Sequence, residues 1–181
     1  MKKSTLLALV VLFAATSVLV ANNLSRIRIF LSGAEEVPYV STVAAGEFNA
    51  DIVENGTKIV WTLEYEGLEG TVTQAHIHVG QRSVNGGISV WLCSNLTSPP
   101  TPTGVQPCLA PPARLTGTAT AADVVGPAAQ GVAAGEFAEL LNAIRQGDAY
   151  ANVHSTKFPG GEIRAQIKAH GGSGRADEGA R

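Results

Sequence analysis

Regular alternation of apolar and polar residues on either side of an Asn-Gly pair constrains the fold of this chain more than any other feature. EFNADIV (47–53) and KIVWTLEYEGL (58–68) both alternate, and ENGT (54–57) connects them. Successive side chains of a strand point to opposite faces, and Asn-Gly is typical of a tight hairpin turn. The pattern therefore predicts an antiparallel hairpin with one buried and one solvated face. Its apolar positions include Phe48, Ala50, Ile52, Ile59, Trp61, Leu63 and Tyr65.

Short segments of strand character recur along the chain. They are IRIFLSG (27–33), TVTQAHIHVG (71–80), ISVWLCS (88–94), AYANVHS (149–155) and GEIRAQIKA (161–169). RLTGTATAADVV (114–125) is expected to lead into a short helix. Many short strands separated by turns, with few helices, predict an all-β fold: an antiparallel β-sandwich or flattened barrel with one or two short connecting helices.

One segment has helical periodicity instead. In GEFAELLNAIRQ (135–146), Phe137, Leu140, Leu141 and Ile144 form one apolar stripe. Glu136 is expected in the first turn, and Gly147 follows as a C-cap.

The N-terminal segment has the features of a secretory signal peptide. Two lysines precede an apolar run from about Leu6 to Val20, and cleavage is expected after Ala21 or, as the other option, nearer Ser17. The alternative is an uncleaved anchor helix, but the run is short for a bilayer, which takes about 20 apolar residues. We therefore expect an exported protein, periplasmic, extracellular or at the cell surface, with no membrane attachment after cleavage. The expected divisions are a signal peptide over 1–21, one domain over 22–170 and a disordered tail over 171–181.

Cys93 and Cys108 are the two cysteines of the chain, and they flank a proline-rich segment. A pair of cysteines in an exported chain predicts a disulfide. A pair of thiolate ligands is the alternative, but the spacing is far from the short C-x2-4-C of zinc sites.

Charge and motifs exclude several classes of function. The formal net charge is −2, so there is no basic excess to neutralise phosphates, and we expect no nucleic-acid partner. The Gly-Gly pairs at 86–87 and 160–161 are predicted to be turns, because neither belongs to a strand–loop–helix phosphate cradle. No Ser/His/Asp order or lone reactive cysteine indicates nucleophilic catalysis.

The histidines of AHIHVG carry the main functional hypothesis. His76 and His78 are one residue apart on a predicted strand, so their side chains point to the same face and can chelate one ion. His154, on a later strand, is the expected third ligand. Imidazole suits copper, zinc and nickel; copper is the preferred ion and zinc the second choice. Further ligands considered are His170, Glu35, Glu36 and Glu162.

The alternative for these histidines is structural: each would bond to a backbone group or a carboxylate and stabilise a strand end.

Trp61 and Trp91 are expected in the core, since both lie in alternating strands. Arg164 is expected on a strand face, paired with a glutamate.

Four ordered stretches resemble the motifs of the CHRD domain, which is named for chordin. They are LSGAEEVPYVSTVAAGEF (31–48), WTLEYEGLEGTVTQAHIHVG (61–80), ADVVGPAAQG (122–131) and AYANVHSTKFPGGEIRAQI (149–167). The resemblance implies an immunoglobulin-like β-barrel or sandwich similar to that of copper–zinc superoxide dismutases. It implies little about activity, since most microbial members lack a defined one.

Comparison with the dismutases adds a third hypothesis. AHIH and NVHS resemble the dismutase strands that carry copper histidines, and Arg164 lies roughly where dismutases keep an anion-guiding arginine. However, positions 79–110 contain no His and no Asp, so the bridging imidazole and zinc site have no counterpart there. The sequence thus leaves three hypotheses: a non-catalytic copper-binding protein, a metal-free module that binds extracellular protein or glycan, and a copper-only dismutase-like enzyme.

Overall fold

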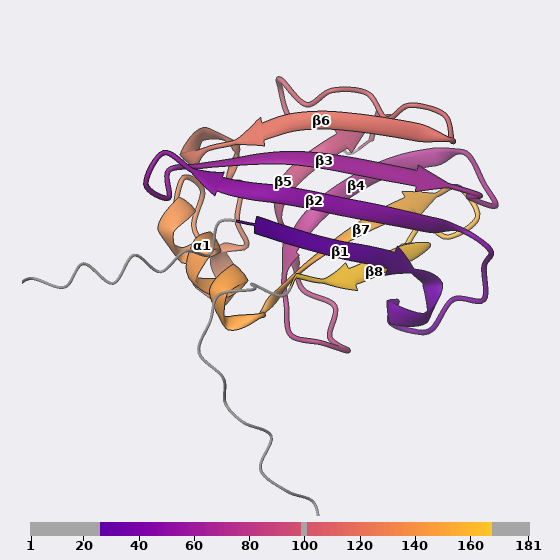
Figure 1. The fold of residues 1–181 in the computed structure, drawn as a ribbon, viewed down its shortest axis with the longest axis horizontal. Helices are drawn as coiled ribbons and strands as arrows, with labels where there is room; N and C mark the ends of the chain where they lie inside the picture. Colours follow the sequence, from indigo (N-terminus) through magenta and orange to yellow (C-terminus); the bar gives the residue numbers. More distant parts are fainter. Residues whose placement is uncertain (1–25, 99–100, 168–181) are drawn as a thin grey trace, which may run out of the picture.

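The predicted strands form one sheet that curls into a nearly closed barrel (Figure 1). The computed structural model describes residues 26–98 and 101–167. The strands are β1 (Arg26–Ser32), β2 (Ala45–Val53), β3 (Lys58–Glu66), β4 (Val72–Val79), β5 (Gly87–Ser94), β6 (Ala113–Ala119), β7 (Ala149–Ser155) and β8 (Ile163–Gln166). Each pairs antiparallel with its neighbours in the order β5-β4-β7-β8-β1-β2-β3-β6. The all-β prediction is confirmed.

The hairpin predicted around the Asn-Gly pair is formed by β2 and β3. Val53 pairs with Lys58 at its closed end, and the register continues without interruption along both strands. Glu54, Asn55 and Gly56 turn the chain with φ values of 51°, 57° and 84°. Positive φ is the region that glycine and asparagine tolerate best, which suits Asn55 and Gly56, whereas Glu54 adopts it without that preference.

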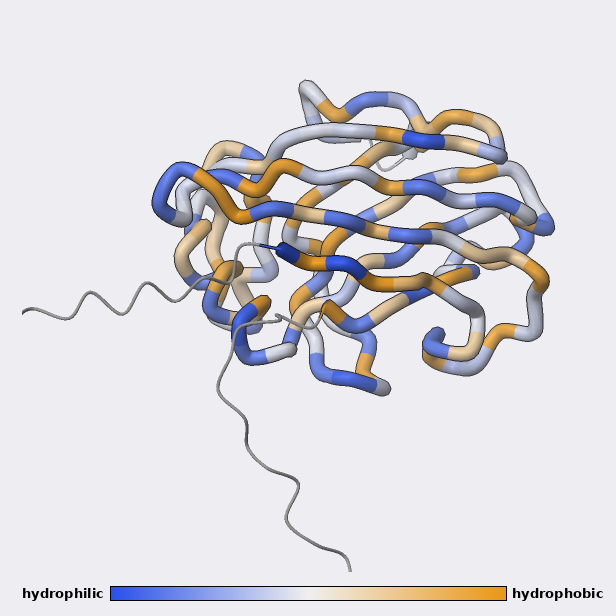
Figure 2. Tube along the Cα trace, viewed as in Figure 1, coloured by the Kyte–Doolittle hydropathy of each residue, from blue (hydrophilic) through white to orange (hydrophobic). Residues whose placement is uncertain are grey.

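Alternation along the strands separates a barrel interior from an outer surface. All four apolar residues predicted for the inner face of β3 are buried, as is Phe48 of β2. The same alternation of hydropathy can be followed along the strands in Figure 2. Equivalent positions of the other strands complete the core, including Ile27, Ile29, Leu31, Ala75, Ile77, Leu115, Ala151, Val153, Ile163 and Ala165.

Helix α1 (Phe137–Gln146) lies at one end of the barrel, against β7 and β4. Its predicted stripe is buried, and Gly147 ends the helix with a φ of 79°. The helix begins at Phe137 rather than Gly135, because Glu136 has non-helical backbone angles and is the N-cap. A one-turn 3-10 helix at Ala121–Asp123 confirms the short helix expected after β6. Two further 3-10 turns lie at Gly33–Glu35 and Ala128–Gln130.

The barrel has a seam where β5 and β6, the two ends of the sheet order, face each other. A single bridge, Val90 to Val124, connects β5 to the segment that follows β6. The amide of Gln106 also crosses the seam, donating to Leu92 O at 3.3 Å and to Thr116 O at 3.1 Å. The Cys93–Cys108 disulfide is formed as predicted and ties the proline-rich segment to β5.

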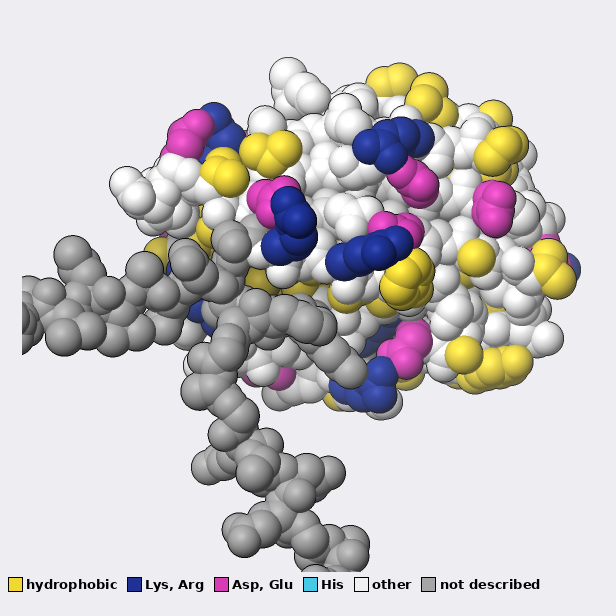
Figure 3. Space-filling view, viewed as in Figure 1, with side chains coloured by type: hydrophobic (Ala, Val, Ile, Leu, Met, Phe, Trp, Pro, Cys, Tyr) yellow, Lys and Arg dark blue, Asp and Glu magenta, His cyan; other side chains and the backbone are white. Residues whose placement is uncertain are grey.

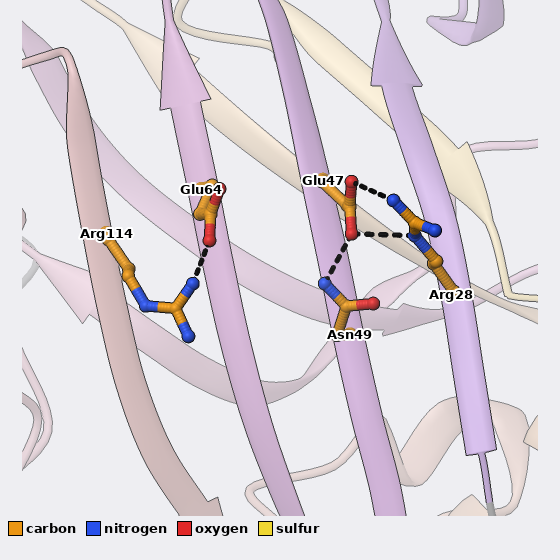
Figure 4. A network of polar contacts seen from close by, with 5 residues as sticks. All are labelled: Arg28, Glu47, Asn49, Glu64 and Arg114. Carbon is orange, nitrogen blue, oxygen red and sulfur yellow. Dashed lines mark hydrogen bonds and ion pairs between the residues drawn. The ribbon is translucent and has the colours of Figure 1, made fainter.

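The outer face of β1, β2, β3 and β6 carries exposed ion pairs. Arg28 donates to both carboxylate oxygens of Glu47, and Arg114 pairs with Glu64 across β6 and β3 (Figure 4). Basic and acidic side chains therefore lie next to one another over this surface (Figure 3).

Several expectations fall outside the described residues, namely the signal peptide over 1–21, the tail over 171–181 and His170. Within 26–98 and 101–167, no helix has the length and apolarity required to cross a bilayer.

Candidate metal centre

The three candidate histidines lie on neighbouring strands and share one face. In the β4–β7 ladder His76 pairs with Asn152, and His154 pairs with Gln74, two residues before His76. Side chains two residues apart on a strand share a face, so all three imidazoles project from the same side of the sheet. The opposite side of these strands faces the core through Ala75, Ile77, Ala151 and Val153.

The shared face is an outer face of the barrel, yet it is buried. His76, His78 and His154 expose only 1%, 7% and 6% of their surface. One nitrogen from each histidine can be chosen such that the three atoms lie within 4.8 Å of one another. The tertiary structure thus brings together all three ligands predicted from the sequence.

Hydrogen bonds fix the tautomers of two rings. His78 Nδ1 lies 3.0 Å from Gly86 O, and His154 Nδ1 lies 2.9 Å from Pro159 O. A carbonyl can only accept, so each Nδ1 carries the proton and each Nε2 presents a lone pair in the neutral ring. Histidines that bind metals are oriented in this way, with the second ring nitrogen donating to a carbonyl or carboxylate.

His76 completes the group through its Nδ1, which lies 3.3 Å from His154 Nε2. Without a metal, the His76 N–H donates to the His154 lone pair; if a metal bound to Nδ1, that proton would instead lie on His76 Nε2, which is also buried without a partner among the described residues. Two nitrogens bound to one tetrahedral ion at about 2.0–2.1 Å are themselves separated by about 3.3 Å. His78 Nε2 is buried with no hydrogen-bond partner among the described residues. A cation among these nitrogens would satisfy a lone pair that is otherwise unpaired.

The environment keeps all three imidazoles neutral. Burial, together with the neighbouring imidazoles, lowers the pKa of His76 to about 2. Burial also lowers the pKa of His78 to about 4, although its bond to Gly86 opposes the shift. The pKa of His154 is lowered by burial as well. Neutral imidazole is the form that binds a metal ion, so the rings need not lose protons at pH 7 to act as ligands.

A stack of side chains supports His78 from the other side. The His78 and Tyr150 rings are parallel with centroids 4.6 Å apart, and the Arg164 guanidinium lies 3.3 Å from the Tyr150 centroid. The Tyr150 hydroxyl accepts a hydrogen bond from Gly86 N at 3.1 Å. Because Gly86 also holds His78 through its carbonyl, this stack orients the His78 ring.

Arg164 does not make the ion pair that was expected. It exposes 1% of its surface and donates to Gln81 O, Val84 O and Asn85 Oδ1 at 2.9–3.3 Å. Hydrogen bonds from the buried Arg164 guanidinium therefore hold the 81–86 loop over the histidine face. Arg164 still acts on Glu36 through its charge. Burial raises the pKa of Glu36 to about 7, and the positive charge of Arg164 partly opposes that shift.

Two of the three candidate carboxylates have other partners. Glu35 accepts two hydrogen bonds from Arg82, and Glu162 accepts from Thr42 and from the Glu69 N–H. Glu36 is buried near Asn152 and Arg164. None of the three belongs to the group of converging ligand atoms, which consists of histidines alone.

The two tryptophans differ from each other. Trp61 is buried, as predicted, but Trp91 is only half-buried, so the prediction of a core position is wrong for it. Its ring meets His76 at right angles, with centroids 4.3 Å apart. The β4–β5 ladder has register shifts on both sides of the His76–Ile77 pairs. Such irregularities re-aim side chains next to functional sites.

Comparison with protein families now gives the context of this arrangement. The model of the CHRD domain matches residues 27–167. This chain belongs to the CHRD family. The match spans the barrel from Ile27, the second residue of β1, and includes all three histidines. Comparisons with curated proteins and with solved structures give no significant match, so the likeness to superoxide dismutases rests on the sequence motifs alone.

Sequence reasoning missed the residues that orient the CHRD histidines. The carbonyls of Gly86 and Pro159 come from loops, and no periodicity points to them. Tyr150 and Asn152 could have been found, because AYANVHS places both on the face of His154.

Proposed function

We propose that this CHRD protein is an exported, non-catalytic metal-binding protein that holds one copper ion through His76, His78 and His154. One observation carries the proposal: three buried, neutral imidazoles place ligand nitrogens within 4.8 Å of one another. Bound copper would supply either a cargo for metal handling or a redox-inert cross-link between β4 and β7. An oxidising compartment is consistent with the disulfide.

Copper is preferred over zinc for a chemical reason. For a given set of nitrogen ligands, affinity among divalent first-row metals tends to peak at copper. The three ligands are neutral imidazoles, without the thiolates or carboxylates that complete many zinc sites.

The metal-free alternative predicts that each histidine is either isolated or occupied by a backbone or carboxylate partner. His78 and His154 do have backbone partners, but only through Nδ1. Their Nε2 atoms face the group, and His78 Nε2 has no partner among the described residues. This division of roles favours metal binding over a purely structural use.

A dismutase-like activity has less support. It requires an open coordination position reached from solvent, with a cation to guide the anion. Arg164 is the candidate for that cation, and its donors are turned to loop oxygens beneath the surface. We therefore propose binding without catalysis.

Isothermal titration of the purified, tag-free protein with Cu(II) and Zn(II) tests the proposal. We expect one Cu(II) per chain at sub-micromolar affinity, weaker Zn(II) binding, and loss of the site in the His76→Ala/His78→Ala variant. His170→Ala is the matched control and is expected to keep the affinity, since three imidazoles converge without it. Electron paramagnetic resonance of the Cu(II) form should show nitrogen ligands. Absence of stoichiometric binding by folded wild-type protein would overturn the proposal.

A further inference from the structure

The seam between β5 and β6 contains a cleft that the metal site does not use. Its volume is about 410 Å³, which is within the range of small-molecule sites. Trp61 of β3, Trp91 of β5 and Gly117 of β6 line it, together with Gln106 and Asp123. The cleft exists because β5 and β6 are ends of the sheet order and do not pair with each other.

Trp61 provides an unused hydrogen-bond donor at this cleft. Trp61 exposes 4% of its surface, and its indole Nε1 is buried with no acceptor among the described residues. A Cβ at position 117 would lie 2.3 Å from the Trp61 ring, so glycine there lets the indole lie against the β6 backbone. Buried donors normally have an acceptor, and a ligand oxygen in the cleft could provide one.

Trp91 adds an aromatic surface on the β5 side. It is half-buried and lines the cleft, while its ring also contacts His76. The remaining lining is mixed: apolar side chains such as Leu92, Val105 and Val125 alternate with Gln106 and three threonine hydroxyls, and Asp123 is the one ionisable side chain among the described lining residues. A ligand here would meet an aromatic ring, donors and acceptors together.

These features select among ligand classes. An anion is disfavoured, because the one charged group is a carboxylate. An added peptide strand is disfavoured, because the Gln106 amide already bridges Leu92 and Thr116 across the seam. A quaternary ammonium ion could use the tryptophans and Asp123, but it has no acceptor for the Trp61 N–H. A sugar ring has C–H groups to pack on an aromatic face and hydroxyls that both donate and accept.

We propose that the β5–β6 cleft is a binding site for a neutral sugar unit of an extracellular glycan, with Trp91 as the stacking surface and Trp61 Nε1 as a donor. This site is separate from the histidine group, although Trp91 contacts both.

Tryptophan fluorescence and isothermal titration test the site with defined probes: hexasaccharides of β-1,4-glucose, xylose, mannose and N-acetylglucosamine, with choline as the cationic probe. The titrations are carried out in EDTA, so that failure of metal binding cannot affect the result. At least one hexasaccharide is expected to bind saturably and change the emission, and choline is not.

Variants locate the binding. Trp91→Ala should weaken it roughly tenfold or more, and Trp61→Phe, which keeps a ring but removes the N–H, by about fivefold. Tyr39→Ala removes an aromatic side chain that is 68% exposed and outside the cleft, and it should leave the affinity unchanged. If circular dichroism shows that Trp91→Ala is unfolded, Trp91→Phe is used instead. Its affinity is expected to lie between those of the wild type and a variant without the ring. Absence of saturable binding of any hexasaccharide, binding of choline instead, or equal affinity in the Trp91 and Tyr39 variants would each overturn the proposal.

Discussion

Two outer faces of the same sheet carry polar side chains, but only one of them is solvated. On β1, β2, β3 and β6, Arg28, Glu47, Glu64 and Arg114 pair at the surface (Figure 4). On β4, β7 and β8, most polar side chains expose less than a tenth of their surface. They include His76, His78, Asn152, His154, Arg164 and Gln166. Water satisfies the first face, whereas the second depends on internal partners; the unpaired nitrogens there are the basis for proposing a metal site.

Replacing one arginine on each face should give the largest contrast. Arg164→Ala removes the donors of three loop oxygens, and we expect a loss of about 3 kcal/mol in the free energy of unfolding. Arg114→Ala breaks an exposed ion pair and should cost at most about 1 kcal/mol. Urea denaturation measures both. Equal losses would mean that the 81–86 loop does not depend on Arg164.

Acid should weaken the buried face selectively. The pKa values of the three histidines are lower in the folded state than the ordinary 6.5, so the unfolded chain binds more protons below that pH. Each histidine then removes stability by about 1.4 kcal/mol per pH unit as the pH falls below about 6.5.

Glu36 acts in the opposite sense, because its pKa is raised to about 7 and its protonation favours the folded state as the pH falls. Three histidines against one glutamate give a net loss of roughly 2 kcal/mol or more between pH 7 and pH 5 in metal-free protein. Urea midpoints measured across this range in EDTA check the sign. Stability that rises toward pH 5 would contradict buried neutral imidazoles.

Tyr150→Phe should cause a smaller loss of stability and of copper affinity, because the Tyr150 hydroxyl connects the 81–86 loop to the His78 ring. The variant keeps the ring stacked on His78 but loses the hydroxyl that accepts from Gly86 N. We expect about 1 kcal/mol of stability to be lost. Copper affinity should fall roughly tenfold, the low end of what residues that orient metal ligands contribute. Titration calorimetry would exclude a role for the hydroxyl if the affinity were unchanged.

Salt should have the smallest effect and should act on the solvated face. Ion pairs such as Arg28–Glu47 and Arg26–Asp51 are exposed, and 1 M salt shortens the Debye length to about 3 Å. The difference in unfolding free energy between wild type and Glu47→Gln should be below about 1 kcal/mol and should shrink as salt is added. A difference that persists at 1 M salt would show that this pair is not screened by solvent.

Much of this molecule could be predicted because strand alternation is a local property. The β2–β3 hairpin, the buried stripe of α1 and the shared face of His76 and His78 all follow from side-chain geometry over a few residues. Trp91 shows the limit of this reasoning. It lies in an alternating strand, but it pairs with His76 and packs on that ring at the outer face, so it is not enclosed in the core.

The sequence by itself determined the all-β architecture, the disulfide and the three histidines that could bind a metal, since each depends on spacing or on residue type. Only the tertiary structure decided that His154 lies beside His76, because their proximity depends on the pairing of β4 with β7 across 78 residues of chain. It also decided that two loops supply the carbonyls that set the tautomers, and that Arg164 lies beneath a loop instead of in an ion pair. Backbone carbonyls are the same in every residue type, so no sequence pattern can mark the ones that will face a histidine.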